Sequence, residues 1–180
     1  MTITLTETHL NEKILDSEIQ MKNYIGFRED RTLSRKNGCV IIYIKGTEAF
    51  DAEQLIAKSN SYVEYQLIHK KKRNIVIINV YRPQNCPTEK FSSPLNELRT
   101  KLIEMGNQMP NTILTGDLNF PIIYWQMETA DGGTHKNQDQ ANAFLQFAQE
   151  QCLQQYIEEP TRKITYSMSF SLIITNSPDK

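Results

Sequence analysis

The sequence of 180 residues is 39% hydrophobic and 23% charged, which is ordinary for one globular domain with its own core. Lys and Arg number 20 against 21 Asp and Glu, and the formal net charge of −1 excludes a basic body that would hold a polyanion by itself. Three scattered cysteines without a CxxC pair suggest neither a zinc site nor a disulfide framework, and they favour an intracellular location, with the nucleus as one candidate. No apolar run reaches the roughly 20 residues of a membrane span, and the N-terminus lacks the basic region of a signal peptide.

The N-terminal residues alternate polar and apolar side chains, which predicts a strand over residues 2–8. Ile3 and Leu5 share one face of this strand, and Glu7 continues their parity. A carboxylate on a face that apolar residues bury needs a partner or a metal, so Glu7 is unusual there. In the alternative interpretation the strand has already ended and Glu7 is solvated. A short helical turn is expected over residues 16–21.

Three further strands are predicted in the first half, from a β-branched run over residues 39–44, from alternating side chains over residues 61–69, and from an apolar run over residues 74–81. The third is apolar on both faces, which predicts a central position in a sheet. A charged loop is expected over residues 28–38. Residues 70–73, three lysines and an arginine, form a hairpin tip that is either a solvated turn or a phosphate contact.

Two helices are predicted in the second half of the chain. The first lies within residues 88–106, with Ser93 as its cap and Pro94 at its first helical position. The second begins at Asn137, whose side chain is expected to form a capping box with Gln140 three residues later. Both segments carry an apolar stripe at helical spacing.

A short strand over residues 112–119 contains an Asp-x-Asn sequence, and a proline follows it. Because side chains alternate along a strand, Asp117 and Asn119 are predicted to point the same way, about 7 Å apart. An acid and an amide at a strand end suit a phosphate, a water or a hard cation. Strands with helices set between them predict an α+β fold in which helices cover packed sheets, with Glu7, Tyr81 and this pair at strand ends.

Four motifs occur in order along the chain. They are Thr-Glu-Thr-His-Leu at 6–10, Asn-Val-Tyr-Arg-Pro at 79–83, Thr-Gly-Asp-Leu-Asn-Phe-Pro at the start of 115–125, and Glu-Pro-Thr-Arg at 159–162. Together they resemble the endonuclease/exonuclease/phosphatase superfamily, and above all the endonuclease domain of non-LTR retrotransposons. The resemblance implies a single partial domain over residues 1–180 with a four-layer α/β/β/α sandwich that lacks edge elements. It also implies DNA as the partner, with no obligate protein partner, and a reverse transcriptase in a longer polyprotein.

The resemblance assigns roles to particular residues. It implies that Glu7 binds Mg²⁺ (or Mn²⁺), that Asp117 aligns and deprotonates the attacking water, and that Asn119 positions the scissile phosphate. It further implies that the hydroxyl of Tyr81 contacts the phosphate or the leaving oxygen. Thr161 stands where the retrotransposon group has a DNA-contacting threonine. Such a site neutralises the charge that develops on phosphate oxygens.

Three further features leave alternatives open. Arg82 follows Tyr81 at a strand end and is either a contact with nucleic acid or an ordinary surface arginine. Trp125 is expected to be a core anchor more often than a platform for base stacking. A phosphatase or deadenylase of the same superfamily fits less well, because residues 120–125 and 159–162 suit the retrotransposon group.

The sequence also departs from the superfamily pattern. It contains neither the asparagine motif that precedes the glutamate strand nor the Ser-Asp-His motif that supplies a catalytic histidine, and Ser171 stands where the group commonly has aspartate. Its three histidines, His9, His69 and His135, match no such context. We therefore expect weak or absent nuclease activity for this polypeptide. The alternative function is a catalytically dead remnant with at most weak nucleic-acid binding.

Overall fold

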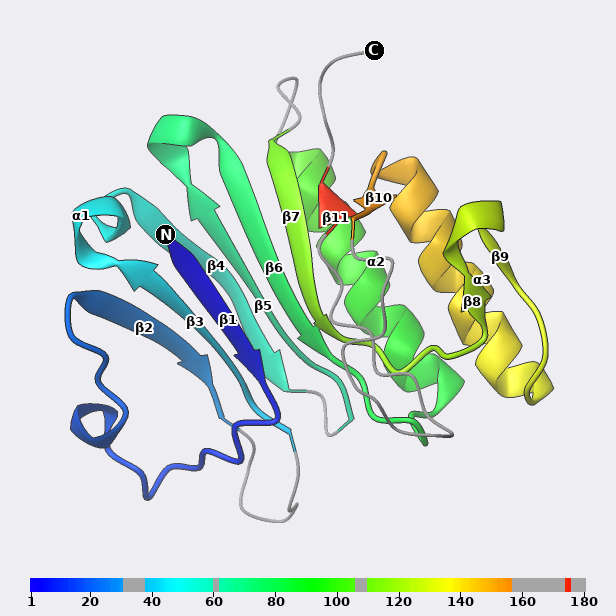
Figure 1. Cartoon of the computed structure of the whole chain (residues 1–180), viewed down its shortest axis with the longest axis horizontal. Helices are drawn as coiled ribbons and strands as arrows, with labels where there is room; N and C mark the ends of the chain where they lie inside the picture. The colour runs from blue at the N-terminus through cyan, green and yellow to red at the C-terminus, as the bar shows by residue number, and fades with distance from the viewer. Residues whose placement is uncertain (31–37, 60–61, 106–109, 157–173, 176–180) are drawn as a thin grey trace.

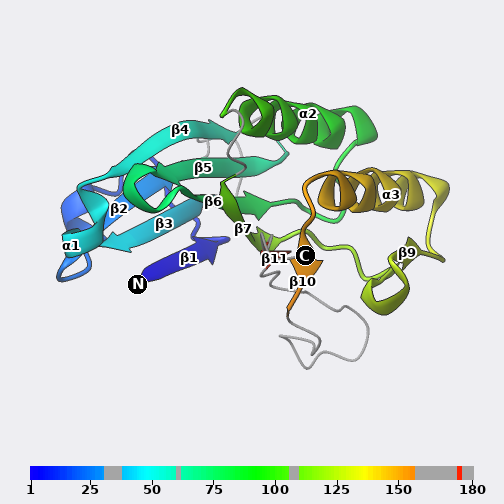
Figure 2. The same cartoon turned by 90° about the horizontal axis from the view of Figure 1, so that it is seen from above.

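The computed structural model describes residues 1–30, 38–59, 62–105, 110–156 and 174–175. Within them two β-sheets pack face to face, and two long helices cover the outer face of the larger sheet (Figures 1 and 2). This mixed α+β arrangement agrees with the predicted fold class. None of the helices in the described part of the chain is long and apolar enough to cross a membrane.

The larger sheet has six strands in the order β10-β11-β7-β6-β5-β4. Their bounds are β4 Ala52–Ser59, β5 Glu64–Lys70, β6 Ile75–Tyr81, β7 Asn111–Asp117, β10 Gln154–Gln155 and β11 Ile174–Thr175. β6 and β7 run parallel, whereas the other neighbouring pairs are antiparallel. Parallel neighbours need a crossover, which α2 (Thr88–Glu104) supplies. The predicted central strand is confirmed as β6, because it lies inside the sheet and is buried from its second residue onward.

The smaller sheet has the order β1-β3-β2, and all its pairs are antiparallel. Its bounds are β1 Thr2–Thr6, β2 Tyr24–Glu29 and β3 Val40–Lys45. Ile42 and Ile44 of β3 pack against Ile68 and Ile77 of the larger sheet. The charged segment predicted as a loop over residues 28–38 begins inside β2. Because β2 is an edge strand, its charged side chains reach ion-pair partners and solvent without crossing the core.

Two helices form the layer outside the larger sheet. α2 and α3 (His135–Glu150) lie side by side on it, with α2 above β4 and β5 and α3 on the side of β10 and β11 in Figure 2. The remaining elements are α1 Gly46–Ala49, the 3-10 turns η1 Asp16–Glu18, η2 Lys71–Arg73 and η3 Trp125–Met127, and the hairpin strands β8 Ile123–Tyr124 and β9 Thr129–Ala130. The apolar stripes of both long helices enter one core with the outward face of the larger sheet.

The starts of both long helices differ from the sequence prediction. α2 begins six residues before Pro94, which is accommodated inside the helix. The additional turn buries Phe91 completely, and this burial outweighs the capping preference of the predicted start. α3 is capped by Thr134, whose side chain accepts from the Asn137 amide at 3.4 Å, so Asn137 is not the cap. Gln140 is buried and is therefore not part of a capping box.

The outer face of the smaller sheet is covered by residues 10–21, which contain only the turn η1. This irregular segment packs on the outward residues Cys39, Ile41 and Tyr43. The described residues thus form three layers, α/β/β, with irregular chain in the place where the sandwich implied by the resemblance has its fourth layer.

Candidate active site

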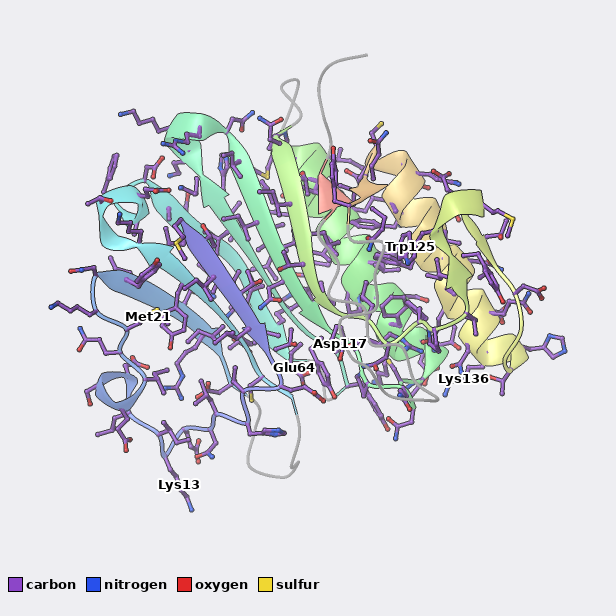
Figure 3. All side chains as sticks on the ribbon, in the orientation of Figure 1. Lys13, Met21, Glu64, Asp117, Trp125 and Lys136 are labelled. Carbon is purple, nitrogen blue, oxygen red and sulfur yellow. The ribbon has the colours of Figure 1, made fainter. Side chains whose placement is uncertain are left out.

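Three neighbouring strands of the larger sheet, β5, β6 and β7, place polar side chains at the same end of the sheet. The strand registers place Glu64 of β5 opposite Tyr81 of β6, and Tyr81 opposite Asp117 of β7. Directly opposite residues share a face of a sheet, and this face meets the smaller sheet. Figure 3 shows the labelled Glu64 and Asp117 at the same end of the sheet. We call this set of three side chains the acidic row.

Glu7 reaches the acidic row from the smaller sheet. The hydroxyl of Tyr81 donates a hydrogen bond of 2.8 Å to Glu7 Oε1, although 74 positions separate the two residues. β1 ends at Thr6, and Glu7 has a left-handed backbone with φ of 53°. The predicted parity is therefore wrong, because the strand ends before Glu7 and because Leu5 is 42% exposed and not buried. The alternative interpretation, a solvated Glu7, holds only in part, because its carboxylate accepts from Tyr81 and its side chain is half-buried.

The environment of Tyr81 keeps its hydroxyl protonated. Burial raises the pKa of Tyr81, and the hydrogen bond to Glu7 and the charges of Glu7, Glu64 and Asp117 raise that pKa further. A neutral phenol remains a hydrogen-bond donor at physiological pH. Tyr81 can therefore donate to an anionic oxygen, whether it belongs to Glu7 or to a phosphate.

The position of Asp117 depends on the glycine before it. Gly116 has φ of 132°, and a Cβ built on it would lie 1.9 Å from the carbonyl oxygen of Val80. Only glycine permits this close approach of β7 to β6. Asp117 follows as the last residue of β7 and is 6% exposed. The conformation at Gly116 thus fixes where the carboxylate leaves the sheet.

Asn119 does not continue β7, so the predicted strand alternation of the Asp-x-Asn pair is wrong. The strand ends at Asp117, and Asn119 adopts a left-handed φ of 51°. Its backbone amide donates to Asp117 Oδ1 at 3.1 Å, which closes an Asx-type turn. Its side-chain amide donates to the carbonyl oxygen of Arg82 at 2.8 Å. The acid and the amide are therefore joined by a turn, and their relation does not come from strand periodicity.

Arg82 lies in the interior, which corrects both sequence interpretations of it as a surface residue. It is 1% exposed. Its Nε donates to Gln140 Oε1 at 2.8 Å, and its Nη1 donates to the carbonyl oxygens of Leu118 and Asn119 at 3.0 and 3.2 Å. Its guanidinium carbon lies 4.1 Å from the ring centre of Phe120. These contacts tie Arg82 to the turn that carries Asn119.

The remaining candidates fall in different places. Thr161 lies outside the described residues. Trp125 packs against the edge of Phe144 with 6.2 Å between ring centres, which agrees with a core anchor. His69 contacts Asn74 near the hairpin tip, at the opposite end of β5 from the acidic row. In that same hairpin Lys71 forms an ion pair with Glu53, so this basic tip does not lie at the site.

Sequence reasoning missed Glu64, which is fully buried beside Tyr81. In the sequence it stands inside the alternating strand expected over residues 61–69, and no motif marks it. The signal was nevertheless present, because β5 and β6 form a hairpin with a short tip. Lys70 and Ile75 pair on either side of the tip, and counting six residues away from each places Glu64 opposite Tyr81.

A hard cation such as Mg²⁺ would find few protein ligands at this end of the sheet. No group of three or more His, Cys, Asp or Glu side chains in the described residues is arranged to hold a metal. Mg²⁺ commonly uses one or two carboxylates and keeps several waters. The half-buried carboxylate of Glu7 beside the acidic row suits such a site, because the neighbouring negative charges attract a cation.

The packed sheets and the family model that the chain matches identify it as a domain of the endonuclease/exonuclease/phosphatase superfamily. The chain belongs to the endonuclease-reverse transcriptase family, whose model matches residues 75–178. No curated protein matched the chain.

Solved structures of nucleases share the fold at low sequence identity. The AP endonuclease LMAP from Leishmania major is 14% identical with a TM-score of 0.58, over 98% of this chain and 69% of that one. An AP endonuclease from Archaeoglobus fulgidus is 13% identical with a TM-score of 0.55, over 97% and 76%. The endonuclease domain of TRAS1, a telomere-specific non-LTR retrotransposon, is 14% identical with a TM-score of 0.51, over 87% and 68%. At these identities the likeness shows the fold alone.

Proposed function

We propose that this domain binds DNA at the edge formed by Glu7, Tyr81, Asp117 and Asn119, and hydrolyses a phosphodiester bond there with a divalent cation. The observation that carries the proposal is the hydrogen bond between Tyr81 and Glu7, because it joins two sheets at the acidic row. Membership of an endonuclease family supports the same reaction class. The proposal includes a four-layer sandwich that lacks edge elements, a DNA contact at Thr161 and a reverse transcriptase in the same polyprotein.

The side chains of this chain have distinct tasks in the proposed reaction. Asp117 accepts a proton from the attacking water, and its Oδ1 is oriented by the Asn119 amide. The side chain of Asn119 and the neutral hydroxyl of Tyr81 donate to phosphate oxygens that gain charge. Burial of Asp117 and Tyr81 limits competing water and strengthens these polar interactions.

Glu7 would hold Mg²⁺ or Mn²⁺ in this proposal. When bound, such a cation would neutralise charge on the phosphate. Without DNA the single hydroxyl proton of Tyr81 is donated to Glu7 and orients its carboxylate, and with DNA bound it is donated to the phosphate. The left-handed backbone at Glu7 turns the side chain toward the larger sheet, where a continued strand would have turned it away.

Nicking of supercoiled plasmid tests the proposal. Wild type should nick slowly with Mg²⁺ and not with EDTA, and Asp117→Ala and Glu7→Gln should both abolish the reaction. The matched control is Asp139→Asn, an exposed acid on α3, which should nick like wild type. Nicking that persists in EDTA or in Asp117→Ala would contradict the proposed chemistry.

Binding without cleavage is a second candidate function, and the positions of two of the three histidines favour it, whereas the third, His9, follows Glu7 by two residues. His69 lies at the far end of β5, and His135 is exposed at the start of α3. Neither can supply the general acid or base that a phosphodiesterase needs at the acidic row. Duplex binding that falls steeply with salt, without nicking even when imidazole is added, would support this candidate. Imidazole-stimulated nicking by wild type, absent in Asp117→Ala, would support hydrolysis.

A further inference from the structure

We propose that Arg82 is the positioning residue of the site: its buried guanidinium sets the turn that presents Asn119 and links that turn to helix α3. This inference rests on the proposed function, because the turn matters for catalysis only if Asn119 contacts a phosphate. Its structural part concerns the shape of the turn and stands on the contacts of this chain.

Arg82 and the turn hold each other from both backbone and side chain. The Arg82 amide donates to the Asp117 carbonyl oxygen at 2.8 Å, and the Asn119 side chain donates to the Arg82 carbonyl oxygen at 2.8 Å. The Arg82 Nη1 then closes on the carbonyl oxygens of Leu118 and Asn119. Four hydrogen bonds therefore connect one residue to three consecutive positions. A left-handed residue such as Asn119 persists only where its surroundings fix it in this way.

The guanidinium is held by neutral groups. Its side chain donates to two backbone carbonyls and to the amide oxygen of Gln140. Its charge lies over the faces of Phe120 and Phe91, with 4.1 and 5.5 Å from the guanidinium carbon to the ring centres. Burial lowers the pKa of Arg82 to about 10, which leaves the side chain charged at neutral pH. A fully buried cation of this kind is costly unless several polar contacts use its geometry.

Gln140 connects this arrangement to the helical layer. Its Oε1 accepts from Arg82, and its Nε2 donates to the carbonyl oxygen of Cys86 at 2.8 Å and to Thr88 Oγ1 at 3.3 Å. Gln140 is on α3, and Thr88 begins α2. The position of the turn at the end of β7 is thus linked to both helices through one buried amide.

Lysine cannot replace arginine in this arrangement. The planar guanidinium donates in two directions at once, to Gln140 from Nε and to the turn from Nη1. An ammonium group keeps the charge but cannot span both directions from the same stem. Arg82→Lys therefore separates the effect of geometry from the effect of charge. Arg99→Lys is the matched control, because Arg99 makes its ion pair with Glu150 on the outer surface of the helices.

Site-resolved NMR of the whole 180-residue chain tests the structural part without any need for activity. In Arg82→Lys, hydrogen exchange of the Asn119 backbone and side-chain amides should accelerate about tenfold or more, the loss expected for about one hydrogen bond. The side-chain amide of Asn79, which donates to Leu5 and Ile41 and not to the turn, is the internal control and should not change. Unchanged hydrogen-exchange rates of the Asn119 amides in a folded Arg82→Lys protein would overturn the proposal.

A second variant keeps the test decisive if Arg82→Lys does not fold. Gln140→Met keeps the length and burial of the side chain but removes the acceptor for Arg82 Nε. It should accelerate exchange at Asn119 in the same direction and by a smaller factor. Exchange at Asn119 equal to wild type in folded Gln140→Met would also overturn the proposal.

Nicking kinetics test the functional part. Arg82→Lys should lower kcat about 100-fold through misplacement of Asn119, whereas Arg99→Lys should not, and Mn²⁺ affinity at Glu7 should be unchanged in both. A folded Arg82→Lys protein with normal kcat would overturn the catalytic role. Failure of wild type to nick would count against the proposed function, and the NMR result would still decide whether Arg82 sets the turn.

Discussion

The two ends of the layer between the sheets differ in chemistry although the same strands build both. Toward the hairpin tip, opposite residues Ile68, Ile77 and Ile113 form an apolar row, and Ile42 and Ile44 of the smaller sheet pack on its first two members. Toward the other end the equivalent row is Glu64, Tyr81 and Asp117, and the smaller sheet contributes Glu7. Between them lies a row of Gln66, Asn79 and Thr115.

The contrast shows how one fold divides stability from chemistry. Apolar contacts at one end hold the two sheets together, and each large aliphatic side chain there contributes a few kcal/mol. The other end contains buried acids and left-handed backbone at Glu7 and Asn119, features that cost free energy. Substitutions at the two ends should therefore have opposite signatures: loss of stability at the apolar end, and loss of function with smaller stability effects at the acidic row.

The largest effect is expected where β7 passes closest to β6. Gly116→Ala places a Cβ 1.9 Å from the Val80 carbonyl oxygen at a φ of 132°, so the strands must separate. We expect a loss of about 4 kcal/mol or more, or failure to fold, measured by urea unfolding. Gly132→Ala is the matched control, because Gly132 also has positive φ (83°) but has nothing within 4 Å of the added Cβ. It should lose only about 1 kcal/mol. Equal losses in the two variants would show that close strand contact is not the cause.

The apolar end should respond next. Ile42→Ala removes a fully buried side chain between the sheets and should lower the free energy of unfolding by about 2–4 kcal/mol. At a temperature where the variant is folded, Mn²⁺ affinity should equal that of wild type, because Ile42 does not contact the acidic row. Calorimetry for stability and for metal binding checks both parts. A large drop in Mn²⁺ affinity with normal stability would contradict the assignment of stability to the apolar end and of function to the acidic row.

The row between the two ends, formed by Gln66, Asn79 and Thr115, should show a moderate loss of stability together with a moderate loss of function. Asn79 is fully buried, and its side chain donates to the carbonyl oxygens of Leu5 and Ile41, at 2.9 and 3.3 Å. Asn79→Leu keeps the volume but leaves these carbonyls without that donor, which should cost about 2 kcal/mol. Because Leu5 lies two residues before Glu7, Mn²⁺ affinity should also fall. Urea unfolding and metal titration measure the two effects. If neither stability nor Mn²⁺ affinity falls, Asn79 is not the link between the sheets.

The sequence was most informative where periodicity and burial agree. The central strand β6 follows from an apolar run with β-branched residues, and the motifs identify the family before any geometry is known. The same reasoning missed β4 and β2, because charged and polar residues on edge strands break the alternating pattern. Edge strands owe their position to pairing with a neighbour, and pairing is not visible in a local window.

The site was harder to predict than the fold because its geometry departs from regular structure. Strand periodicity misplaced Glu7 and Asn119, since each has left-handed backbone after a strand has ended. Burial of Arg82 was also missed, because an arginine after a strand is usually exposed and its neutral partner Gln140 lies 58 positions away. These are long-range contacts, and no local pattern encodes them.

The smallest effect is expected at the link between the two sheets within the site. Tyr81→Phe removes the hydrogen bond to Glu7 and should cost about 1 kcal/mol at neutral pH. The pKa of Tyr81 is raised in the folded state, so its contribution to stability is complete below the unfolded value of about 10 and is lost as the pH rises further. Wild-type stability should therefore fall above about pH 10, and the fall should be shallower in Tyr81→Phe.

Urea unfolding between pH 7 and about pH 11 measures this difference. The pKa of Tyr65 is also raised, by burial and by its hydrogen bond to Glu97, so some of the fall should remain in Tyr81→Phe. Tyr65→Phe is the matched control: it should flatten the same part of the curve without changing Mn²⁺ affinity, because Tyr65 bonds to Glu97 of α2 and not to Glu7. If the free energy of unfolding fell equally steeply with rising pH in wild type and in Tyr81→Phe, Glu7 and the acidic row would not hold the Tyr81 proton in the folded protein.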